Sequence, residues 1–293
     1  MKHFPPSELI LNPDGSIYHL NLLPEQIADT VITVGDPDRV HEISKYFDTI
    51  EHKVQKREFV THTGTFRGKR LSVISTGIGT DNIDIVLNEL DALVNIDLKN
   101  RVEKTTLTSL NIIRIGTSGA MQQDIPVDQF LVSQFGIGLD GLMHYYDTQN
   151  NAEEHMTFLH FMEDVSKKTN FPIRPYIASA GENLVEKLAY DFNKGITITC
   201  PGFYAPQGRI LRGNISVNNL LENLSQFSYK DLRCTNFEME TAGIYGLANL
   251  LGHQAISFNA ILANRITNEF SQKPKETVQS LIELVLERVT LLT

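Results

Sequence analysis

The ten residues N-I-I-R-I-G-T-S-G-A, Asn111–Ala120, combine the pattern of a buried strand with an arginine. Ile112, Ile113 and Ile115 are β-branched and apolar, which is typical of a strand covered on both faces. The Gly-Thr-Ser-Gly run that follows them indicates a tight turn. Arg114 therefore stands where a guanidinium without a counter-ion would cost several kcal/mol, and the sequence predicts an anion beside it.

Runs of the same apolar kind recur along the chain and alternate with amphipathic segments. Strands are expected at residues 30–35, 71–77, 111–116, 129–133, 174–180, 236–240 and 255–263, and helices at residues 38–47, 82–95, 153–169, 182–192, 216–226, 241–251 and 275–290. The alternation predicts an α/β fold, a single domain over residues 1–293 with a mixed, mostly parallel central sheet flanked by helices. The polar residues 95–109 are expected to form a surface loop or a helix extension. Ligands of such sheets collect at the carboxyl ends of the strands, so the site is expected there.

Composition argues against several classes of function. The 293 residues are 41% hydrophobic and carry a formal net charge of −9, so no overall basic field exists to attract nucleic acid or an anionic membrane. Two cysteines are too few for a disulfide framework and are typical of a reducing compartment. We see no signal peptide and no apolar run long enough to cross a bilayer, so a cytoplasmic protein is expected. An anion would have to bind at a local cluster of arginines.

A second anion-binding pattern occurs in G-D-P-D-R at residues 35–39. Asp36 suits the N-cap of a helix and Pro37 its first position, which places Arg39 in the first turn beside free backbone N–H groups. Taken alone, this run is a capped helix with an exposed arginine, just as Arg114 alone could pair with a core carboxylate. Two arginines near glycines at the carboxyl ends of strands together favour a shared oxyanion such as phosphate.

Two further runs suit a nucleoside. E-M-E at residues 238–240 places two carboxylates at a strand-to-helix junction, where they either favour a helix N-terminus or accept hydrogen bonds from a sugar diol. F-Y-A-P-Q-G-R at residues 203–209 offers an aromatic face, an amide and a guanidinium that match the carbonyl and imide edge of a heterocycle. G-I-G-L-D-G at residues 136–141 matches a dinucleotide-binding string only literally, because the residues after it do not form a phosphate-binding helix pattern. His155 and His160 do not share a helix face, so no metal pair is expected.

Eight strings in register resemble the nucleoside phosphorylase superfamily and, within it, the uridine phosphorylases. They span almost the whole chain: Y-H-L (18–20), V-G-D-P-D-R-V (34–40), R-E-F (57–59), S-T-G-I-G (75–79), R-I-G-T-S-G (114–119), F-Y-x-x-Q-G-R (203–209), E-M-E (238–240) and N-R (264–265). The resemblance implies reversible phosphorolysis of uridine to uracil and ribose 1-phosphate, with phosphate as co-substrate and no organic cofactor or metal. Purine-cleaving relatives carry an aspartate where this chain reads A-N-R-I-T, and the lack of an acid favours a pyrimidine.

The resemblance also assigns the site residue by residue. It implies a phosphate site of Gly35, Arg39, Arg114, Thr117 and a neighbouring subunit's Arg57, a ribose site of Met239, Glu240 and the neighbour's His19, and a base pocket of Ser118, Gly119, Phe203, Gln207 and Arg209. Arg57 would be read as a solvated side chain without this comparison. A homodimer with shared active sites is therefore expected, alone or within a hexamer built as a trimer of dimers.

Two points stay open at this stage. Bacterial members continue S-T-G-I-G with Gly-Pro-Ser, whereas this chain has Thr-Asp-Asn at residues 80–82, which leaves open the monovalent cation that some members bind near Glu58, Ile78 and the position of Asn82. The alternatives to a phosphorylase are a nucleosidase, in which water replaces phosphate, and a non-catalytic nucleoside-binding protein.

Overall fold

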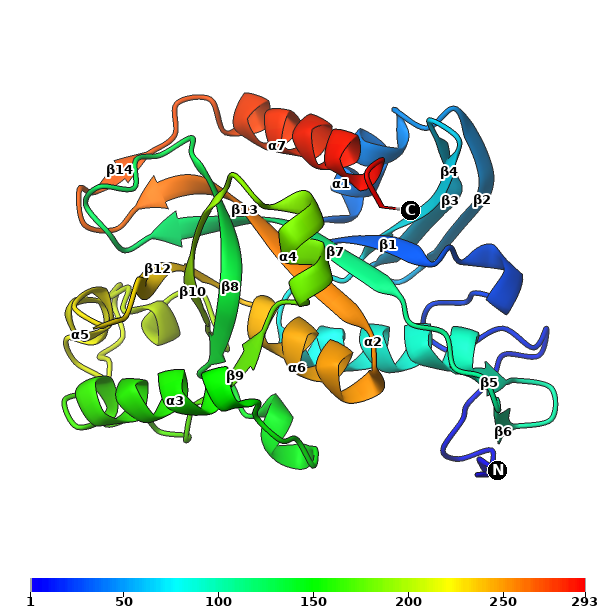
Figure 1. Ribbon diagram of the computed structural model, residues 1–293, viewed down its shortest axis with the longest axis horizontal. Helices are drawn as coiled ribbons and strands as arrows, with labels where there is room; N and C mark the ends of the chain where they lie inside the picture. Colours follow the sequence, from blue (N-terminus) through cyan, green and yellow to red (C-terminus); the bar gives the residue numbers. More distant parts are fainter. Residues whose placement is uncertain (1, 293) are drawn as a thin grey trace.

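The computed structural model describes residues 2–292, and a 12-stranded mixed sheet runs through them (Figure 1). The strands are β1 (Thr30–Val34), β2 (Thr49–Lys56), β3 (Phe59–Phe66), β4 (Lys69–Ser75), β7 (Asn111–Ala120), β8 (Phe130–Gly138), β9 (Tyr176–Ser179), β10 (Asn193–Thr199), β11 (Ser228–Tyr229), β12 (Leu232–Glu238), β13 (Gln254–Asn264) and β14 (Glu269–Phe270). The helices are α1 (Pro37–Ser44), α2 (Thr80–Asn95), α3 (Ala152–Phe161), α4 (Glu182–Leu188), α5 (Leu220–Ser225), α6 (Thr241–Leu251) and α7 (Pro274–Val289).

The strand order is β11-β12-β10-β8-β13-β7-β1-β4-β3-β2, and β12 pairs with β7 as well. Strands β7, β12, β10, β8 and β13 therefore form a closed ring, which we call the ring below. Parallel pairing is found in β1–β4, β1–β7, β7–β13, β8–β10 and β10–β12. The pairs β8–β13, β7–β12, β2–β3 and β3–β4 are antiparallel, so the prediction of a mixed sheet is confirmed.

The side chains of β7 alternate between two apolar cores. Ile112 packs in a cluster with α2 and α6, whereas Ile113 and Ile115 pack in a cluster with α1, α4 and α7. In Figure 1, α7 and α1 lie above the sheet and α2 and α6 below it. Burial of both faces explains the continuous β-branched run of this strand. Since side chains in a strand alternate, Arg114 and Gly116 lie on the same face as Ile112.

The structure corrects several expectations about local structure. The Gly-Thr-Ser-Gly run is not a turn: β7 continues to Ala120, because β13 pairs with it along its whole length and β12 pairs with its end. Strands β2, β3 and β10 were not predicted. β2 is a polar strand at the edge of the sheet, and β3 mixes buried Thr and His with apolar residues, so neither shows a clean alternation.

Two other segments also differ from the sequence-based expectation. Residues 95–109, expected as a loop or helix extension, contain a small hairpin of β5 (Ile96–Asp97) and β6 (Val102–Glu103). The helix expected to reach residue 169 ends at Phe161 and continues as a π-helical turn, Met162–Ser166.

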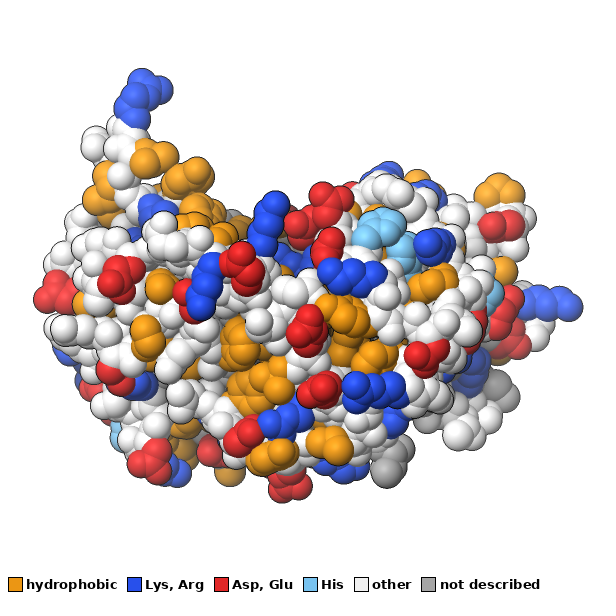
Figure 2. Space-filling model, turned by 90° about the horizontal axis from the view of Figure 1, so that it is seen from above, with side chains coloured by type: hydrophobic (Ala, Val, Ile, Leu, Met, Phe, Trp, Pro, Cys, Tyr) orange, Lys and Arg blue, Asp and Glu red, His pale blue; other side chains and the backbone are white. Residues whose placement is uncertain are grey.

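The surface agrees with the acidic net charge. Acidic and basic side chains are interspersed over the face shown in Figure 2, which carries no continuous basic area. Among residues 2–292, no helix combines the length and the apolar character that a membrane span requires.

Candidate active site

Arg114 is held by two carboxylates of the same chain. Its Nη2 lies 2.6 Å from Glu240 Oε2 and 3.1 Å from Glu238 Oε2, and the residue is 6% exposed. Gly116 makes room for the guanidinium, because a Cβ at Gly116 would lie 1.9 Å from Arg114 Nη1. The core carboxylate considered for Arg114 is therefore present, and phosphate would be an additional anion.

The two carboxylates have different tasks. Glu238 ends β12 and accepts hydrogen bonds from the backbone N–H groups of Glu240 and Thr241, both at 2.8 Å, and from the Thr199 hydroxyl at 2.5 Å. It therefore caps α6 from within the core, and sequence reasoning did not include it in the site. Glu240 accepts a hydrogen bond from Gly79 N–H at 2.9 Å, at the start of α2.

Glu240 keeps free capacity to accept hydrogen bonds. A carboxylate offers about four acceptor positions. Within residues 2–292, Glu240 Oε1 accepts from Gly79 N–H and Glu240 Oε2 accepts from the Arg114 guanidinium, so the other positions are free. Burial raises the pKa of the Glu240 carboxyl, Arg114 lowers it, and the charge of Glu238 raises it again, with a net upward shift. Met239 lies half-buried between the two glutamates.

The start of α1 agrees with the sequence prediction. Asp36 is the N-cap, and its carboxylate accepts a hydrogen bond from Asp38 N–H at 3.0 Å, while Pro37 occupies the first helical position. Gly35 joins β1 to this cap at a close approach, since a Cβ there would lie 3.4 Å from the carbonyl oxygen of Gly77. In this first turn Pro37 has no N–H, and the N–H groups of Asp38 and Arg39 already donate to the carboxylate and the carbonyl oxygen of Asp36. The free backbone N–H groups expected beside the arginine are therefore not found in the first turn, and the Arg39 side chain is the donor there.

Arg39 points back toward the carboxyl end of the sheet. Its Nη1 donates to the carbonyl oxygen of Ile115 at 3.4 Å, and the side chain is half-buried. Burial lowers the pKa of Arg39, Asp36 partly offsets this, and the nearby positive charge of Arg114 lowers the pKa further. Two guanidiniums close enough to repel each other are an arrangement that an anion would stabilise. Arg39 and Thr117 line a cavity of about 530 Å³ between α1 and α7.

The residues predicted for the base lie around a second cavity, of about 390 Å³. It is lined by the end of β7, the loop at residues 203–209, and β13 with the turn after it, and its lining includes Thr117, Ser118, Gly119, Phe203, Gln207, Arg209 and Arg265. Thr117 and Leu262 line both this cavity and the cavity of Arg39. The candidate base and phosphate positions are therefore adjacent.

The polar side chains that line the base cavity hold one another in position through direct contacts. The Arg209 guanidinium lies 3.8 Å from the centre of the Phe203 ring and donates to Gln207 Oε1 at 2.5 Å. Because the Gln207 oxygen is used in this way, its amide N–H groups are left as donors. Burial, and then the charge of Arg265, lower the pKa of Arg209 to about 10.

Arg265 is a residue that the assignment of the base pocket missed. Its Nη1 donates to the carbonyl oxygen of Gln207 at 2.9 Å, and it lines the cavity beside Arg209. Arg265 belongs to the N-R string at residues 264–265, one of the eight strings that carry the resemblance. This region served only to show that the chain lacks the aspartate of the purine-cleaving relatives. The signal for a second cation in the pocket was therefore in the sequence.

His19 and Arg57 lie elsewhere in the chain. His19 Nδ1 contacts Glu89 Oε1 of α2 at 2.7 Å and lines a different cavity, beside the N-terminal segment. Arg57 is exposed in the turn between β2 and β3, with a φ of 55°. Within residues 2–292 of one chain, neither side chain lines the cavity of Arg209 or that of Arg39.

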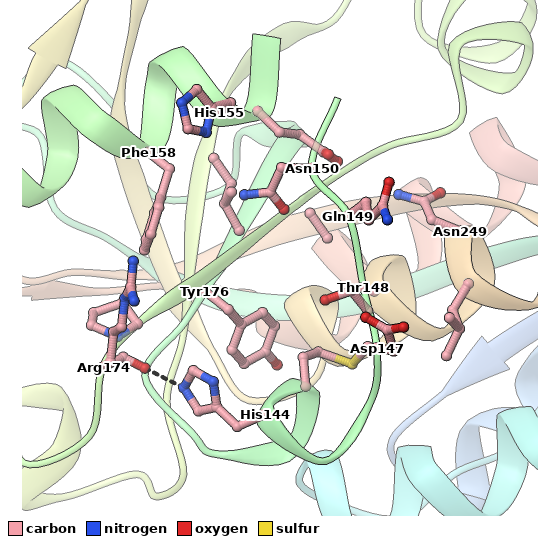
Figure 3. Close-up of a pocket in the computed structure, with 17 residues that line it drawn as sticks. His144, Asp147, Thr148, Gln149, Asn150, His155, Phe158, Arg174, Tyr176 and Asn249 are labelled. Atoms are coloured by element: carbon pink, nitrogen blue, oxygen red, sulfur yellow. Dashed lines mark hydrogen bonds between the residues drawn. The ribbon is translucent and has the colours of Figure 1, made fainter. Parts of the chain in front are cut away.

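Another cavity, of about 770 Å³, contains none of the predicted residues (Figure 3). It lies between α3 and α6, with Tyr176 on its floor and His144 Nε2 in contact with the Arg174 carbonyl oxygen at 2.6 Å. Tyr176 also explains the glycine string at residues 136–141, because a Cβ at Gly138 would lie 2.2 Å from the Tyr176 ring. Gly136 serves packing as well, since a Cβ there would lie 2.8 Å from Ala242 Cα.

The chain belongs to the phosphorylase superfamily, whose family model matches residues 29–291. Within that superfamily it resembles uridine phosphorylases. It is 31% identical over 262 residues to the uridine phosphorylase of Thermococcus kodakarensis, covering 88% of this chain and 81% of that protein. It is 26% identical over 277 residues to the uridine phosphorylase of Haemophilus influenzae, covering 93% and 96%. A Trypanosoma brucei nucleoside phosphorylase that shows uridine phosphorylase activity has the same fold, with a TM-score of 0.88, 28% identity, and coverage of 96% of this chain and 99% of that one.

Proposed function

We propose that this chain catalyses the reversible phosphorolysis of uridine to uracil and ribose 1-phosphate. The observation that carries the proposal is the junction at Thr117, where the cavity with Arg39 meets the cavity with Gln207 and Arg209. Uracil fits the second cavity, phosphate lies toward Arg39 and Arg114, and the ribose bridges them over Glu240. The similarity to uridine phosphorylases supports the same reaction.

The reaction exchanges one bond at C1′ of the ribose. A phosphate oxygen forms the new bond to C1′, the bond from C1′ to N1 breaks, and its electron pair leaves with uracil. Positive charge builds on the sugar and negative charge on the base. Phosphate beside Arg39 and Arg114 supplies both the nucleophile and the countercharge, and no organic cofactor is required.

The donors of the base cavity act on the charge that develops on uracil. Arg209 and the Gln207 amide are already ordered by their contact with each other, so they need no reorganisation during the reaction. A preorganised donor of this kind contributes about 3 kcal/mol to the stability of the transition state. The free acceptor positions of Glu240 suit the 2′,3′-diol and would hold C1′ in line with phosphate.

A second copy of the chain would complete the site. Arg57 and His19 lie away from both cavities of their own chain, and the resemblance assigns them to a neighbour's phosphate and ribose. We therefore propose a homodimer with shared sites. The proposal includes no monovalent cation near Glu58, because Asn82 stands where the cation-binding members carry a serine hydroxyl. Asn82 and Glu58 lie close together, since a Cβ at Gly77 would lie 2.3 Å from Asn82 Nδ2 and 3.1 Å from Glu58 Cγ.

Uridine consumption, followed by absorbance with and without phosphate, tests the proposal. A nucleosidase would cleave uridine equally well in both conditions, and a nucleoside-binding protein would cleave it in neither. Phosphorolysis requires phosphate, so uridine should be cleaved only when phosphate is present. Inosine serves as the control substrate: a kcat/KM for inosine comparable to that for uridine would contradict the pyrimidine assignment.

A further inference from the structure

Buried polar side chains form a continuous chain of hydrogen bonds around the ring. Arg114 Nη1 lies 3.2 Å from Asn259 Oδ1 on β13, and Asn259 Nδ2 lies 3.1 Å from Ser133 Oγ on β8. The chain continues through Thr197 on β10 and Asn236 on β12 and returns to β7 at Ser118. It thus links the arginine of the candidate phosphate site to a residue of the base cavity, and we call it the relay.

The remaining links have ordinary hydrogen-bond lengths. Ser133 Oγ lies 2.5 Å from Thr197 Oγ1, Thr197 Oγ1 lies 3.0 Å from Asn236 Oδ1, and Asn236 Nδ2 lies 3.0 Å from Ser118 Oγ. The four residues between Arg114 and Ser118 are at most 1% exposed. Water therefore does not compete for these groups, and each bond strengthens the next.

Arg114 fixes the direction of the bonds at Asn259. A guanidinium can only donate, so Asn259 must present its oxygen to Arg114 and its amide nitrogen to Ser133. Ser133 Oγ accepts that bond and gives its own proton to Thr197, whose proton goes to Asn236 Oδ1. At the other end of the relay, Asn236 Oδ1 accepts from Thr197 at 3.0 Å and from Thr235 at 2.8 Å, which leaves the Asn236 amide nitrogen as the donor. Asn236 then donates to Ser118 Oγ.

The last proton of the relay is the hydroxyl proton of Ser118. Within residues 2–292, the one side-chain hydrogen bond of Ser118 Oγ is the bond that it accepts from Asn236, so its own proton has no acceptor. Ser118 also lines the base cavity. Since Ser118 Oγ already accepts from Asn236, its proton is turned away from that side. The relay therefore presents Ser118 to the base cavity as a donor.

We propose that Asn259, Ser133, Thr197 and Asn236 are positioning residues that make Ser118 a hydrogen-bond donor to a carbonyl oxygen of the base, while Asn259 also orients Arg114. This inference rests on the proposed function, since it names the base cavity as the uracil site. It predicts that a substitution that removes a hydrogen bond in the middle of the relay lowers kcat/KM for uridine and leaves the KM for phosphate unchanged. A break at Asn259 affects both, because it removes a partner of Arg114.

The test compares steady-state kinetics of variants with uridine and phosphate varied in turn. Thr197→Val removes one hydroxyl and keeps the shape of the side chain. It should lower kcat/KM for uridine about three- to tenfold, which is the effect of one hydrogen bond. The KM for phosphate should be unchanged. Thr197→Ser keeps the hydroxyl and should restore the wild-type value. Asn259→Leu should raise KM for phosphate as well as lower kcat/KM for uridine.

Thr157→Val is the matched control. Thr157 is a buried threonine of α3 whose hydroxyl has no hydrogen-bond partner within residues 2–292, and it lines neither cavity of the site. Its variant should retain wild-type kinetics. If Thr197→Val does not fold, Ser133→Ala breaks the neighbouring bond and should give the same separation between uridine and phosphate.

Two results would overturn the relay. One is kinetics of Thr197→Val that match those of Thr157→Val, and the other is an equal change for uridine and phosphate, which would indicate general loosening of the ring. Failure of the proposed function is visible separately, because the wild type itself would then show no phosphate-dependent cleavage of uridine.

Discussion

Replacing Arg114 by alanine should destabilise the protein, although a buried cation is itself costly. The substitution would leave the carboxylates of Glu238 and Glu240, which are 4% and 7% exposed, without the guanidinium that contacts both. Removing one partner of a buried ion pair costs about 3–5 kcal/mol. For a chain of this size each kcal/mol lowers Tm by roughly 2–4 °C, so a decrease of roughly 10 °C is expected.

The pH dependence of this loss identifies its cause. Burial and Glu238 raise the pKa of Glu240, and Arg114 opposes them. Without Arg114 the folded-state pKa rises further above the unfolded value of about 4.3, so the protonated form is favoured in the folded state. Such a group contributes stability at acidic pH and loses it as pH rises through the folded pKa. The Tm difference between variant and wild type should therefore be smaller at about pH 5.5 than at about pH 8.

Thermal unfolding of both proteins at these two pH values is the assay, with Arg114→Ala/Glu240→Gln as the companion variant. Removing the charge of Glu240 should recover part of the lost Tm, because the two side chains are in contact and their effects do not add. The reasoning is refuted if Arg114→Ala is as stable as the wild type, or if its deficit does not change with pH.

Other predictions follow from the same geometry. Gly116→Ala should abolish activity much as loss of Arg114 does, because the added Cβ would lie 1.9 Å from Arg114 Nη1. Gly141→Ala, where the nearest atom would be 3.7 Å from the added Cβ, should be as active as the wild type. Equal activity of the two variants would contradict the packing around Arg114. Arg209→Ala should lower kcat for uridine about a hundredfold, the effect of one transition-state donor, and a loss confined to KM would be the contrary result. Refolding a mixture of Arg57→Ala and Arg209→Ala chains should restore activity that neither variant has alone, since one site of a heterodimer would be complete. No recovery in verified heterodimers would mean that Arg57 does not act across the interface.

Strong local patterns allowed the core of the fold to be predicted from the sequence. The two-sided apolar runs of β1, β7 and β13 and the capped start of α1 are local signals, and each matches the structure. Strands β2 and β3 form a hairpin that was missed because β2 is polar and largely exposed and β3 buries threonine and histidine among its apolar residues. Strand β10 is placed by its pairing with β8, which is distant in sequence. The closure of the ring through β7 and β12 is likewise a long-range pairing that no single segment indicates.

The candidate site was predictable where chemistry follows from short motifs. Arg39, Gln207 and Arg209 lie in recognisable runs and line two cavities that meet at Thr117. The carboxylate pair at Arg114 was less accessible to sequence reasoning, because Glu238 reaches it from another strand. The relay through Asn259 required coordinates, since isolated Ser, Thr and Asn residues in strands carry no signal of their own.

The central claim is that phosphate attacks C1′ of uridine, and the products test it most directly. Uridine should be incubated with the protein and phosphate, and uracil, ribose 1-phosphate and free ribose quantified over the same time course. The account predicts ribose 1-phosphate in equal amount to uracil, and no uracil when phosphate is omitted. Free ribose formed in step with uracil, at a rate independent of phosphate, would contradict it.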